Sequence, residues 1–172
     1  MPFKETLDVR SFTCGDEDLD DFLTTEEVRT YEAQGLGRTY LAYYEGKLVG
    51  YFTISNDGLR YEYLRKTRSF SRSTEKIVDS YPAIKIGRLA AAKEWQNKGI
   101  GRNLIVFIAK LAIESGARSG VRLLIVEAKP SSIRFYERCG FELTSETRRE
   151  RGRRNRTMFL DLGGLTSLLP KD

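Results

Sequence analysis

Residues 83–92 read Ala-Ile-Lys-Ile-Gly-Arg-Leu-Ala-Ala-Ala, and residues 96–103 read Gln-Asn-Lys-Gly-Ile-Gly-Arg-Asn. The first stretch is apolar and follows Pro82, a pattern typical of a buried strand. The second opens a run through Glu114 whose apolar residues nearly encircle a helix, so we expect that helix to be central. A helix N-terminus has unpaired N–H groups, and glycines let a phosphate oxygen approach the main chain. Together these elements predict a pyrophosphate site.

The glycine pattern excludes two common nucleotide sites. It is not the Gly-x-Gly-x-x-Gly of dinucleotide-binding folds, and no Gly-Lys-Ser/Thr follows it, so NAD and ATP are disfavoured. A match to the looser pattern [Gln/Arg]-x-x-Gly-x-[Gly/Ala] arises by chance about once in several chains of this length, so the buried strand directly upstream is what makes the match informative.

The flanking sequence predicts a mixed α/β sheet with a βαβ unit at its centre. An acid-rich helix begins after Asp16, and a short helix runs from Pro130 to Gly140. We expect residues 57–81 to form a loop with a short helix near 74–81. Extended or β-strand structure is expected at residues 3–7, 38–44, 47–55, 121–127, 141–145 and 157–162.

Length and composition narrow the class of protein. The 172 residues are 40% hydrophobic, which fits one globular domain over residues 1–172 and neither disorder nor a repeat array. No window approaches the roughly 20 apolar residues of a membrane helix, and the first residues lack the apolar run of a secretory signal, so we expect a cytoplasmic protein without membrane partners. Histidine is absent and there are two cysteines. We therefore expect no metal site and no His-activated nucleophile.

Charge is distributed unevenly along the chain. Residues 148–156 carry six arginines and one glutamate, whereas residues 16–27 carry seven acids and no base. A second basic segment covers residues 60–76. These segments suggest a polyanionic partner, although solvated loops would show the same pattern.

Three motifs in order resemble the GNAT acyl-CoA-dependent N-acetyltransferases. They are Gly87-Arg88-Leu89-Ala90, Gln96-x-x-Gly99-x-Gly101 and Phe135-Tyr136-x-x-Cys139-Gly140-Phe141. The resemblance spans roughly the whole chain. It implies a mostly antiparallel central sheet with helices on both faces, and acetyl-CoA as the co-substrate.

The resemblance also implies where acetyl-CoA binds. The pantetheine arm would lie along the first buried strand like an added strand, and a main-chain N–H there would stabilise the oxyanion. The pyrophosphate would bind where the helix begins. The implied cofactor-binding residues are Leu89, Ala90, Ala91, Gln96, Lys98, Gly99, Gly101 and Arg102.

Tyr136 is the implied general acid. A phenol with a pKa of about 10 can supply the proton that the leaving thiolate needs. Without the resemblance, Tyr136 would be read as a packing residue beside Phe135. No general base is assigned: Glu127 is the best-placed carboxylate, and Glu62 and Glu94 are weaker candidates. Cys14 and Cys139 are expected to be free thiols without a covalent role.

The acceptor amine follows from a narrower similarity. Phe12-x-Cys14-Gly15-x-x-x-Leu19-Asp20-x-Phe22-Leu23 and the strand Val49 to Ser55 resemble the TacT-like toxin acetyltransferases, which acetylate the α-amine of aminoacyl-tRNA and are paired with ribbon-helix-helix antitoxins. This similarity implies tRNA as substrate, an antitoxin partner and a homodimer. Phosphate contacts are then expected from Arg149, Arg151, Arg153 and Arg154.

Other functions remain open at the level of sequence. A housekeeping enzyme that acetylates a protein N-terminus, a lysine or a polyamine would use the same cofactor site. The fold could also serve as a non-catalytic acetyl-CoA sensor, or the arginine segment could make it an RNA-binding module.

Overall fold

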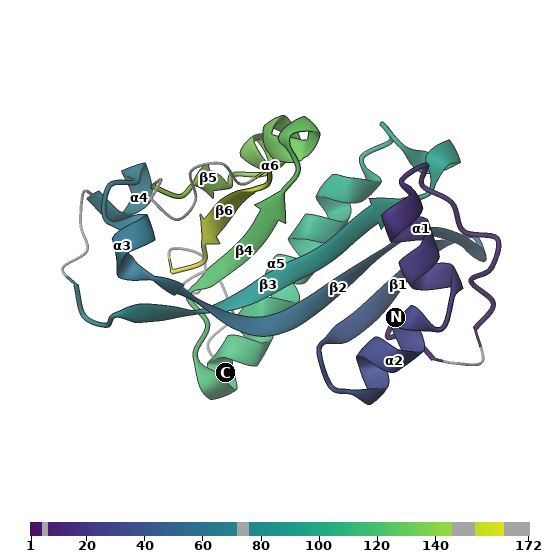
Figure 1. Ribbon diagram of the computed structural model, residues 1–172, viewed down its shortest axis with the longest axis horizontal. Helices are drawn as coiled ribbons and strands as arrows, with labels where there is room; N and C mark the ends of the chain where they lie inside the picture. Colours follow the sequence, from purple (N-terminus) through teal and green to yellow (C-terminus); the bar gives the residue numbers. More distant parts are fainter. Residues whose placement is uncertain (5–6, 72–75, 146–153, 164–172) are drawn as a thin grey trace. The chain divides into compact units, whose positions relative to one another are not determined.

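The computed structural model describes residues 1–4, 7–71, 76–145 and 154–163 (Figure 1). The chain divides into two compact units, the first containing residues 1–55 and 86–108 and the second containing residues 56–85 and 109–172. Strands β2 and β3 and helix α5 run from one unit into the other. The expectation of one domain over residues 1–172 stays a prediction.

The order of elements places a helix between the two central strands. The helices and strands are α1 (Glu17–Thr24), α2 (Glu27–Ala33), β1 (Arg38–Tyr44), β2 (Lys47–Arg60), α3 (Tyr61–Leu64), α4 (Arg68–Ser71), β3 (Ser80–Ala91), η1 (Lys93–Trp95), α5 (Ile100–Ser119), β4 (Leu123–Ala128), η2 (Pro130–Ser132), α6 (Ile133–Arg138), β5 (Glu142–Leu143) and β6 (Arg156–Asp161).

The six strands form one sheet in the order β1-β2-β3-β4-β6-β5. The pairs β1–β2, β4–β6 and β5–β6 are antiparallel. Strands β3 and β4 are hydrogen-bonded neighbours connected through α5, which confirms the predicted βαβ unit.

The β1–β2 hairpin confirms the prediction for residues 38–55. Its turn is Glu45-Gly46, with φ of +47° and +77°. Left-handed φ at both turn residues gives a twist that matches the flanking strands, and glycine adopts it without strain. The N-terminal segment is extended beside the hairpin, where Phe3 donates its N–H to the Thr39 carbonyl over 2.8 Å.

The first unit has helices on both faces of its strands. Successive side chains of a strand point to opposite faces, so Tyr51 and Phe52 of β2 face different layers. The Tyr51 hydroxyl donates to the Leu19 carbonyl of α1 over 2.7 Å, whereas the Phe52 ring packs against Phe107 of α5 at 6.1 Å between centroids. Helices α1 and α5 therefore cover opposite faces, as predicted.

The second unit has its own core. Phe70 of α4 packs edge-on against Tyr81 of β3 and Phe159 of β6, with centroids 5.2 Å and 5.9 Å apart. The other buried members of this core are Leu59, Leu64, Ala83, Leu123 and Ile125. Aromatic pairs in this geometry add to the stabilisation from burial alone.

One sequence prediction is wrong. Within the predicted loop 57–81, β2 continues to Arg60, helices α3 and α4 follow, and residues 76–79 form no helix. Helix α5 connects the neighbouring strands β3 and β4, and two of its apolar residues, Val106 and Phe107, are 63% and 44% exposed. No helix in the described ranges has the length and apolar content needed to span a membrane.

Candidate active site

Helix α5 begins with main-chain amides that have no acceptor inside the helix. Asn97 and Gly99 have φ of +59° and +84°, so residues 96–99 form a tight turn, here called the glycine turn. The first helical hydrogen bond runs from the Asn103 N–H to the Gly99 carbonyl over 3.0 Å. The N–H groups of Ile100, Gly101 and Arg102 therefore precede the helical ladder, where a helix binds anions.

Space and positive charge adjoin these amides. A methyl group placed on Gly99 would meet no atom within 4 Å, so the main chain there is open. The side chains of Lys98 and Arg102 are exposed. The Lys98 ammonium lies 4.9 Å from the centre of the Trp95 ring, and that ring also packs against Tyr44. Trp95 is thus a packing residue that positions Lys98.

The last residues of β3 present polar main-chain groups on alternate sides. The Ala92 N–H donates to the Val49 carbonyl of β2 over 2.9 Å, and the Ala90 carbonyl also faces β2 at Gly50. Because these groups alternate along a strand, those of Leu89 and Ala91 face the other edge. The main-chain groups of Leu89 and the Ala91 N–H therefore face the edge that strand addition would use, whereas the Ala91 carbonyl accepts a hydrogen bond from Gln96 and the Ala90 carbonyl is directed at β2.

Gln96 uses its side chain within the protein. Its amide nitrogen donates to the Cys14 carbonyl over 2.7 Å and to the Ala91 carbonyl over 3.2 Å. These contacts tie the start of the glycine turn to β3 and to the segment before α1. Gln96, which the motif places among the cofactor-binding residues as the first residue of the turn, thus uses its side-chain amide to hold the turn in shape.

Tyr136 lies on α6 in the second unit and is 7% exposed. Its ring packs between Phe135 and Phe141, with centroids 5.1 Å and 5.3 Å away. Burial, with a smaller contribution from the Cys139 thiol, raises the pKa of Tyr136 well above its ordinary value of 10.0. The phenol therefore keeps its proton at neutral pH and yields it less readily than a free tyrosine would.

The three candidate bases all contact other side chains. Glu127 accepts a hydrogen bond from the Thr157 hydroxyl over 3.1 Å, Glu94 accepts one from the Trp95 indole over 3.2 Å, and Glu62 pairs with Arg60 over 3.3 Å. None is distinguished from the others by these contacts, so the base remains unassigned.

Cys14 is a thiol at neutral pH. Burial and the hydrogen bond with Asp20 raise its pKa from 9.0 to about 11. A nucleophilic cysteine needs the opposite shift, toward the thiolate. The expectation that Cys14 has no covalent role stays a prediction, and neither Cys14 nor Cys139 forms a disulfide.

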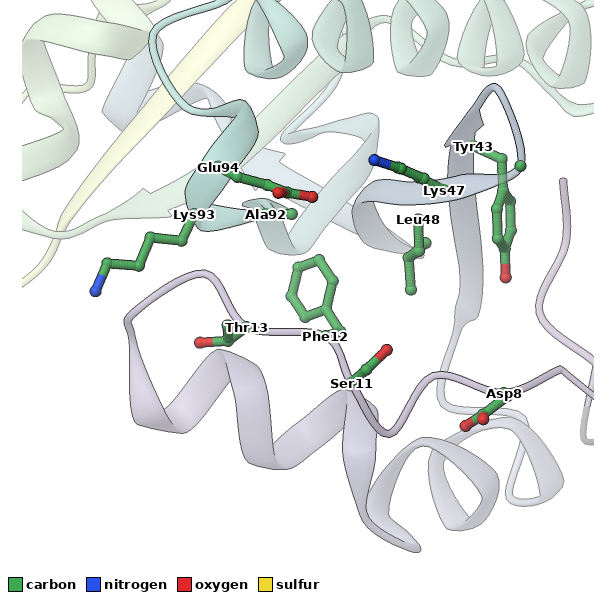
Figure 2. Close-up of a pocket in the computed structure, with 11 residues that line it drawn as sticks. Asp8, Ser11, Phe12, Thr13, Tyr43, Lys47, Leu48, Ala92, Lys93 and Glu94 are labelled. Atoms are coloured by element: carbon green, nitrogen blue, oxygen red, sulfur yellow. The ribbon is translucent and has the colours of Figure 1, made fainter.

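Sequence reasoning missed a pocket beside the segment that precedes α1. The pocket has a volume of about 650 Å³ and is lined by residues 8 and 11–13, by the β1–β2 turn and by residues 92–94 (Figure 2). Phe12 and Leu48 give it an apolar wall, while the carboxylate of Glu94 lies near Ala92 (Figure 2). Its lining comes from three separate segments, so no local pattern indicates it.

A second pocket of about 530 Å³ lies over α1 and α2. The Arg88 guanidinium lies 3.6 Å from the centre of the Phe22 ring and 5.9 Å from that of Tyr31. The motif residue Arg88 is thus a wall of this pocket. The other lining residues are Thr25, Glu26, Glu27, Thr30 and Leu36.

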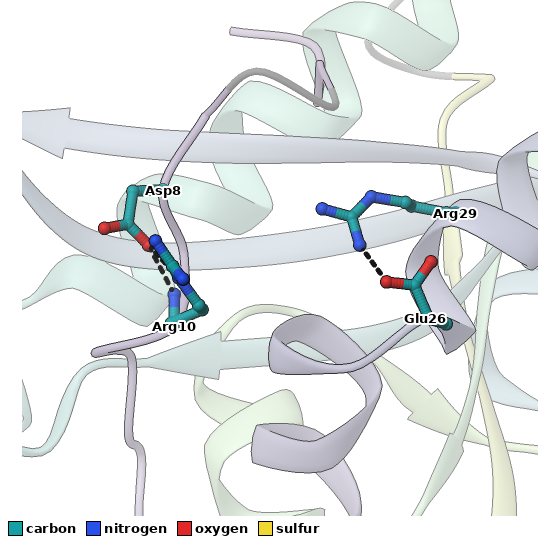
Figure 3. A network of polar contacts seen from close by, with 4 residues as sticks. All are labelled: Asp8, Arg10, Glu26 and Arg29. Carbon is teal, nitrogen blue, oxygen red and sulfur yellow. Dashed lines mark hydrogen bonds and ion pairs between the residues drawn. The ribbon is translucent and has the colours of Figure 1, made fainter.

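Each pocket includes a carboxylate that is already paired. Asp8 accepts hydrogen bonds from the Arg10 side chain and main-chain N–H, both at 3.1 Å, and Glu26 pairs with Arg29 (Figure 3). The Arg10 contacts hold the pKa of Asp8 below its ordinary value. Both pairs are exposed, so they contribute little to stability.

The predicted tRNA contacts lie mostly outside the described residues. This is the case for Arg149, Arg151 and Arg153, whereas Arg154 is described and exposed. Across the ranges that the structure describes, no group of three or more Cys, Asp or Glu side chains could hold a metal ion.

Comparison with known proteins agrees with this arrangement. The sequence model of the acetyltransferase (GNAT) family matches residues 5–141. A tRNA-acetylating toxin of Mycobacterium tuberculosis is 25% identical over 138 residues, which cover 80% of each chain.

Solved structures share the fold at lower identity. A bacterial toxin superposes with a TM-score of 0.80 at 17% identity, over 98% of this chain and 92% of that chain. The toxin AtaT, solved with acetyl-methionyl-tRNAfMet, gives a TM-score of 0.75 at 24% identity, over 94% and 91% of the two chains. A mutant of AtaT has also been solved with the C-terminus of the antitoxin AtaR and acetyl-CoA.

The family match covers the glycine turn, the edge of β3 and Tyr136, the three features to which the sequence motifs assigned the chemistry. Because the family model matches most of the chain, including its β3-α5-β4 unit, the chain belongs to the acetyltransferase (GNAT) family.

Proposed function

We propose that this protein transfers the acetyl group of acetyl-CoA to the α-amine of an aminoacyl-tRNA. The observation that carries the cofactor part is the start of α5, where three amides without helical acceptors adjoin open space at Gly99. A diphosphate fits such a site because aligned N–H groups and the helix dipole favour negative charge. Lys98 and Arg102 add two cations beside it.

Leu89 and Ala91 would hold the rest of the donor substrate. Alternation from Ala92, whose N–H is bonded to β2, directs the main-chain groups of Leu89 and the Ala91 N–H away from β2, so the amides of pantetheine can pair with these groups as an added strand would. The Ala91 carbonyl is occupied by the Gln96 side chain. The Leu89 N–H is then the donor that stabilises the oxyanion on the thioester carbonyl. Ala90 contributes packing, because its carbonyl is directed at β2.

Tyr136 is proposed as the general acid. The acceptor nitrogen attacks the thioester carbon, the carbon–sulfur bond breaks, and the leaving sulfur takes the phenol proton. The amine gives up a proton, which restores the phenol through solvent. An α-amino group has a pKa near 7.7–8.0, so roughly a fifth to a third of it is neutral at physiological pH without a protein base.

The acceptor is proposed to enter the pocket over α1 and α2. Arg88 lines this pocket. The next residue in the chain is Leu89, whose N–H is the proposed oxyanion donor, so a residue of the pocket wall adjoins that donor. Phe22, Tyr31 and Leu36 give it apolar surface for an amino-acid side chain.

Similarity to known toxins supports tRNA as the carrier of that amine. The relative from Mycobacterium tuberculosis is a tRNA-acetylating toxin, and AtaT has been solved with an acetylated aminoacyl-tRNA. The arginine segment, residues 148–156, would supply the phosphate contacts through Arg149, Arg151, Arg153 and Arg154. Such a substrate implies action in the cytoplasm, and the AtaT–AtaR complex suggests an antitoxin partner.

A small cationic amine is the second candidate. Glu26 and Glu27 line the same pocket and would attract a polyamine or a lysine. The basic segments elsewhere in the chain oppose this, because they repel a cation and attract a nucleic acid.

Thiol release with alternative acceptors distinguishes the candidates. Purified protein is incubated with acetyl-CoA and, in separate reactions, with charged tRNA, uncharged tRNA, a peptide and a polyamine. We expect thiol release with charged tRNA only, together with an acetylated aminoacyl group detected by mass spectrometry. Release with the polyamine or the peptide alone would favour the second candidate, and no release with any acceptor would contradict catalysis.

A further inference from the structure

The carboxylate of Asp20 on α1 gathers the donors of three consecutive residues. It accepts hydrogen bonds from the Thr13 hydroxyl over 2.8 Å, from the Cys14 N–H over 2.7 Å and from the Gly15 N–H over 3.3 Å. Partial burial opposes its ionisation, but these hydrogen bonds outweigh burial and lower the pKa of Asp20. Asp20 is therefore charged at neutral pH and fixes loop 13–15.

The same loop is bound on its other side to the segment that leads into α5. The Lys93 N–H donates to the Thr13 carbonyl over 2.8 Å, and the Gln96 amide donates to the Cys14 carbonyl over 2.7 Å. Lys93 belongs to η1 and Gln96 opens the glycine turn. Loop 13–15 thus lies between the Asp20 carboxylate and the residues that set the start of the proposed diphosphate site.

Two successive peptide groups connect the two sides. The peptide between residues 13 and 14 donates its N–H to Asp20 and accepts from Lys93 through its carbonyl, and the peptide between residues 14 and 15 does the same with Asp20 and Gln96. A peptide whose N–H is bound to a charged acceptor has a more strongly polarised carbonyl, so hydrogen bonds in such a chain strengthen one another. The charge on Asp20 therefore strengthens the hydrogen bonds that the carbonyls of loop 13–15 accept from Lys93 and Gln96.

We infer that Asp20 is a positioning residue for donor binding: through loop 13–15, Lys93 and Gln96 it holds the glycine turn in the shape that presents the first amides of α5 to the diphosphate. This inference rests on the proposed function. Asp20 thereby affects acetyl-CoA affinity, although the Asp20 carboxylate contacts only protein atoms. Gln96 acts in the same chain of contacts.

The test compares Asp20→Asn with Asp21→Asn. Asp21 lies on the same helix and is exposed. Asp21→Asn therefore removes the same charge as Asp20→Asn, but from a residue outside the hydrogen bonds that lead to the glycine turn. Acetyl-CoA affinity is measured by calorimetry, and kcat and KM by thiol release. Hydrogen bonds to charged groups change equilibria by about tenfold or more, so Asp20→Asn should bind acetyl-CoA about tenfold more weakly. The rate at saturating acetyl-CoA should stay within about twofold, and Asp21→Asn should bind like wild type.

Gln96→Leu keeps the inference testable if Asp20→Asn does not fold, because the Gln96 side chain is exposed and its removal spares the core. It should weaken acetyl-CoA binding by a similar factor, and where the double variant folds its affinity should be little lower than that of either single variant. Unchanged affinity in Gln96→Leu, or in a folded Asp20→Asn, would overturn the inference while leaving the proposed function intact. A fall in kcat without a change in affinity would overturn it as well. Absence of acetyl-CoA binding by the wild-type protein would instead overturn the proposed function, and this inference with it.

Discussion

Replacing Gly50 by alanine should disturb both the fold and the donor site, because three elements converge on this position. A Cβ at Gly50 would lie 2.7 Å from the Ala90 carbonyl, 3.2 Å from Leu104 and 3.4 Å from Ile100. The first of these atoms belongs to the main chain of β3 and cannot rotate away. Strand β2 must therefore move away from the end of β3 that leads into the glycine turn, and Leu104 of α5 must also give way.

The size of the effect follows from these distances. Overpacking of this kind costs about 1–3 kcal/mol, and for a protein of this size each kcal/mol lowers Tm by about 2–4 °C. We therefore expect Tm to fall by roughly 2–12 °C. Ile100 is the first residue of α5, so acetyl-CoA affinity should fall too, by about tenfold if one charge-assisted hydrogen bond is broken.

Gly46→Ala is the matched control. Gly46 has φ of +77° but open space around it, so alanine there costs about 1–2 kcal/mol through backbone strain alone. Calorimetric unfolding and acetyl-CoA titration of both variants separate the two effects. Gly46→Ala should be less stable and keep its affinity, whereas Gly50→Ala should be impaired in both. A Gly50→Ala variant that matches wild type in both measurements would refute the packing described for this position.

Three further outcomes can be checked. Tyr136→Phe should lower kcat by about a hundredfold or more and leave acetyl-CoA affinity unchanged, whereas an unchanged kcat would remove Tyr136 as the acid. Alanine at all four tRNA-contact arginines should flatten the salt dependence of tRNA binding, by about 0.7–0.9 in log–log slope for each phosphate that is no longer neutralised, and an identical slope would contradict phosphate binding by these residues. Because the pKa of Cys14 is raised to about 11 in the folded protein, its contribution to stability is complete below pH 9.0 and disappears as the pH rises to about 11; urea unfolding of Cys14→Ala should show a shallower decline over that range.

Local sequence signals predicted much of the fold correctly. The turn at Glu45-Gly46, the helix start after the glycine turn and the helix end at Gly140 each depend on residues within a few positions of one another. Such signals can be read one segment at a time. The region 57–81 was predicted wrongly because long-range packing decides it: Phe70 is buried against Tyr81 and against Phe159, which lies far along the chain.

The candidate site was predictable only in part for the same reason. Motifs indicated Gly99 and Tyr136, because their positions relative to the helices follow from neighbouring residues. The direction of the Ala90 carbonyl and the hydrogen bonds of Gln96 depend on strand pairing and on loop 13–15, so the sequence did not reveal them. The partners of Asp20 are near it in sequence, but the bonds from Lys93 and Gln96 to loop 13–15 form only when the end of β3 lies beside that loop.

The most direct test of the proposed donor site is whether the amides at the start of α5 bind the diphosphate of acetyl-CoA. Isotope-labelled protein can be titrated with acetyl-CoA and, separately, with acetyl-pantetheine, which lacks the diphosphate, while the amide resonances of residues 98–102 are followed. We expect these resonances to shift with acetyl-CoA and to stay nearly unchanged with acetyl-pantetheine. Resonances that remain in place while acetyl-CoA binds elsewhere on the protein would contradict the proposed site.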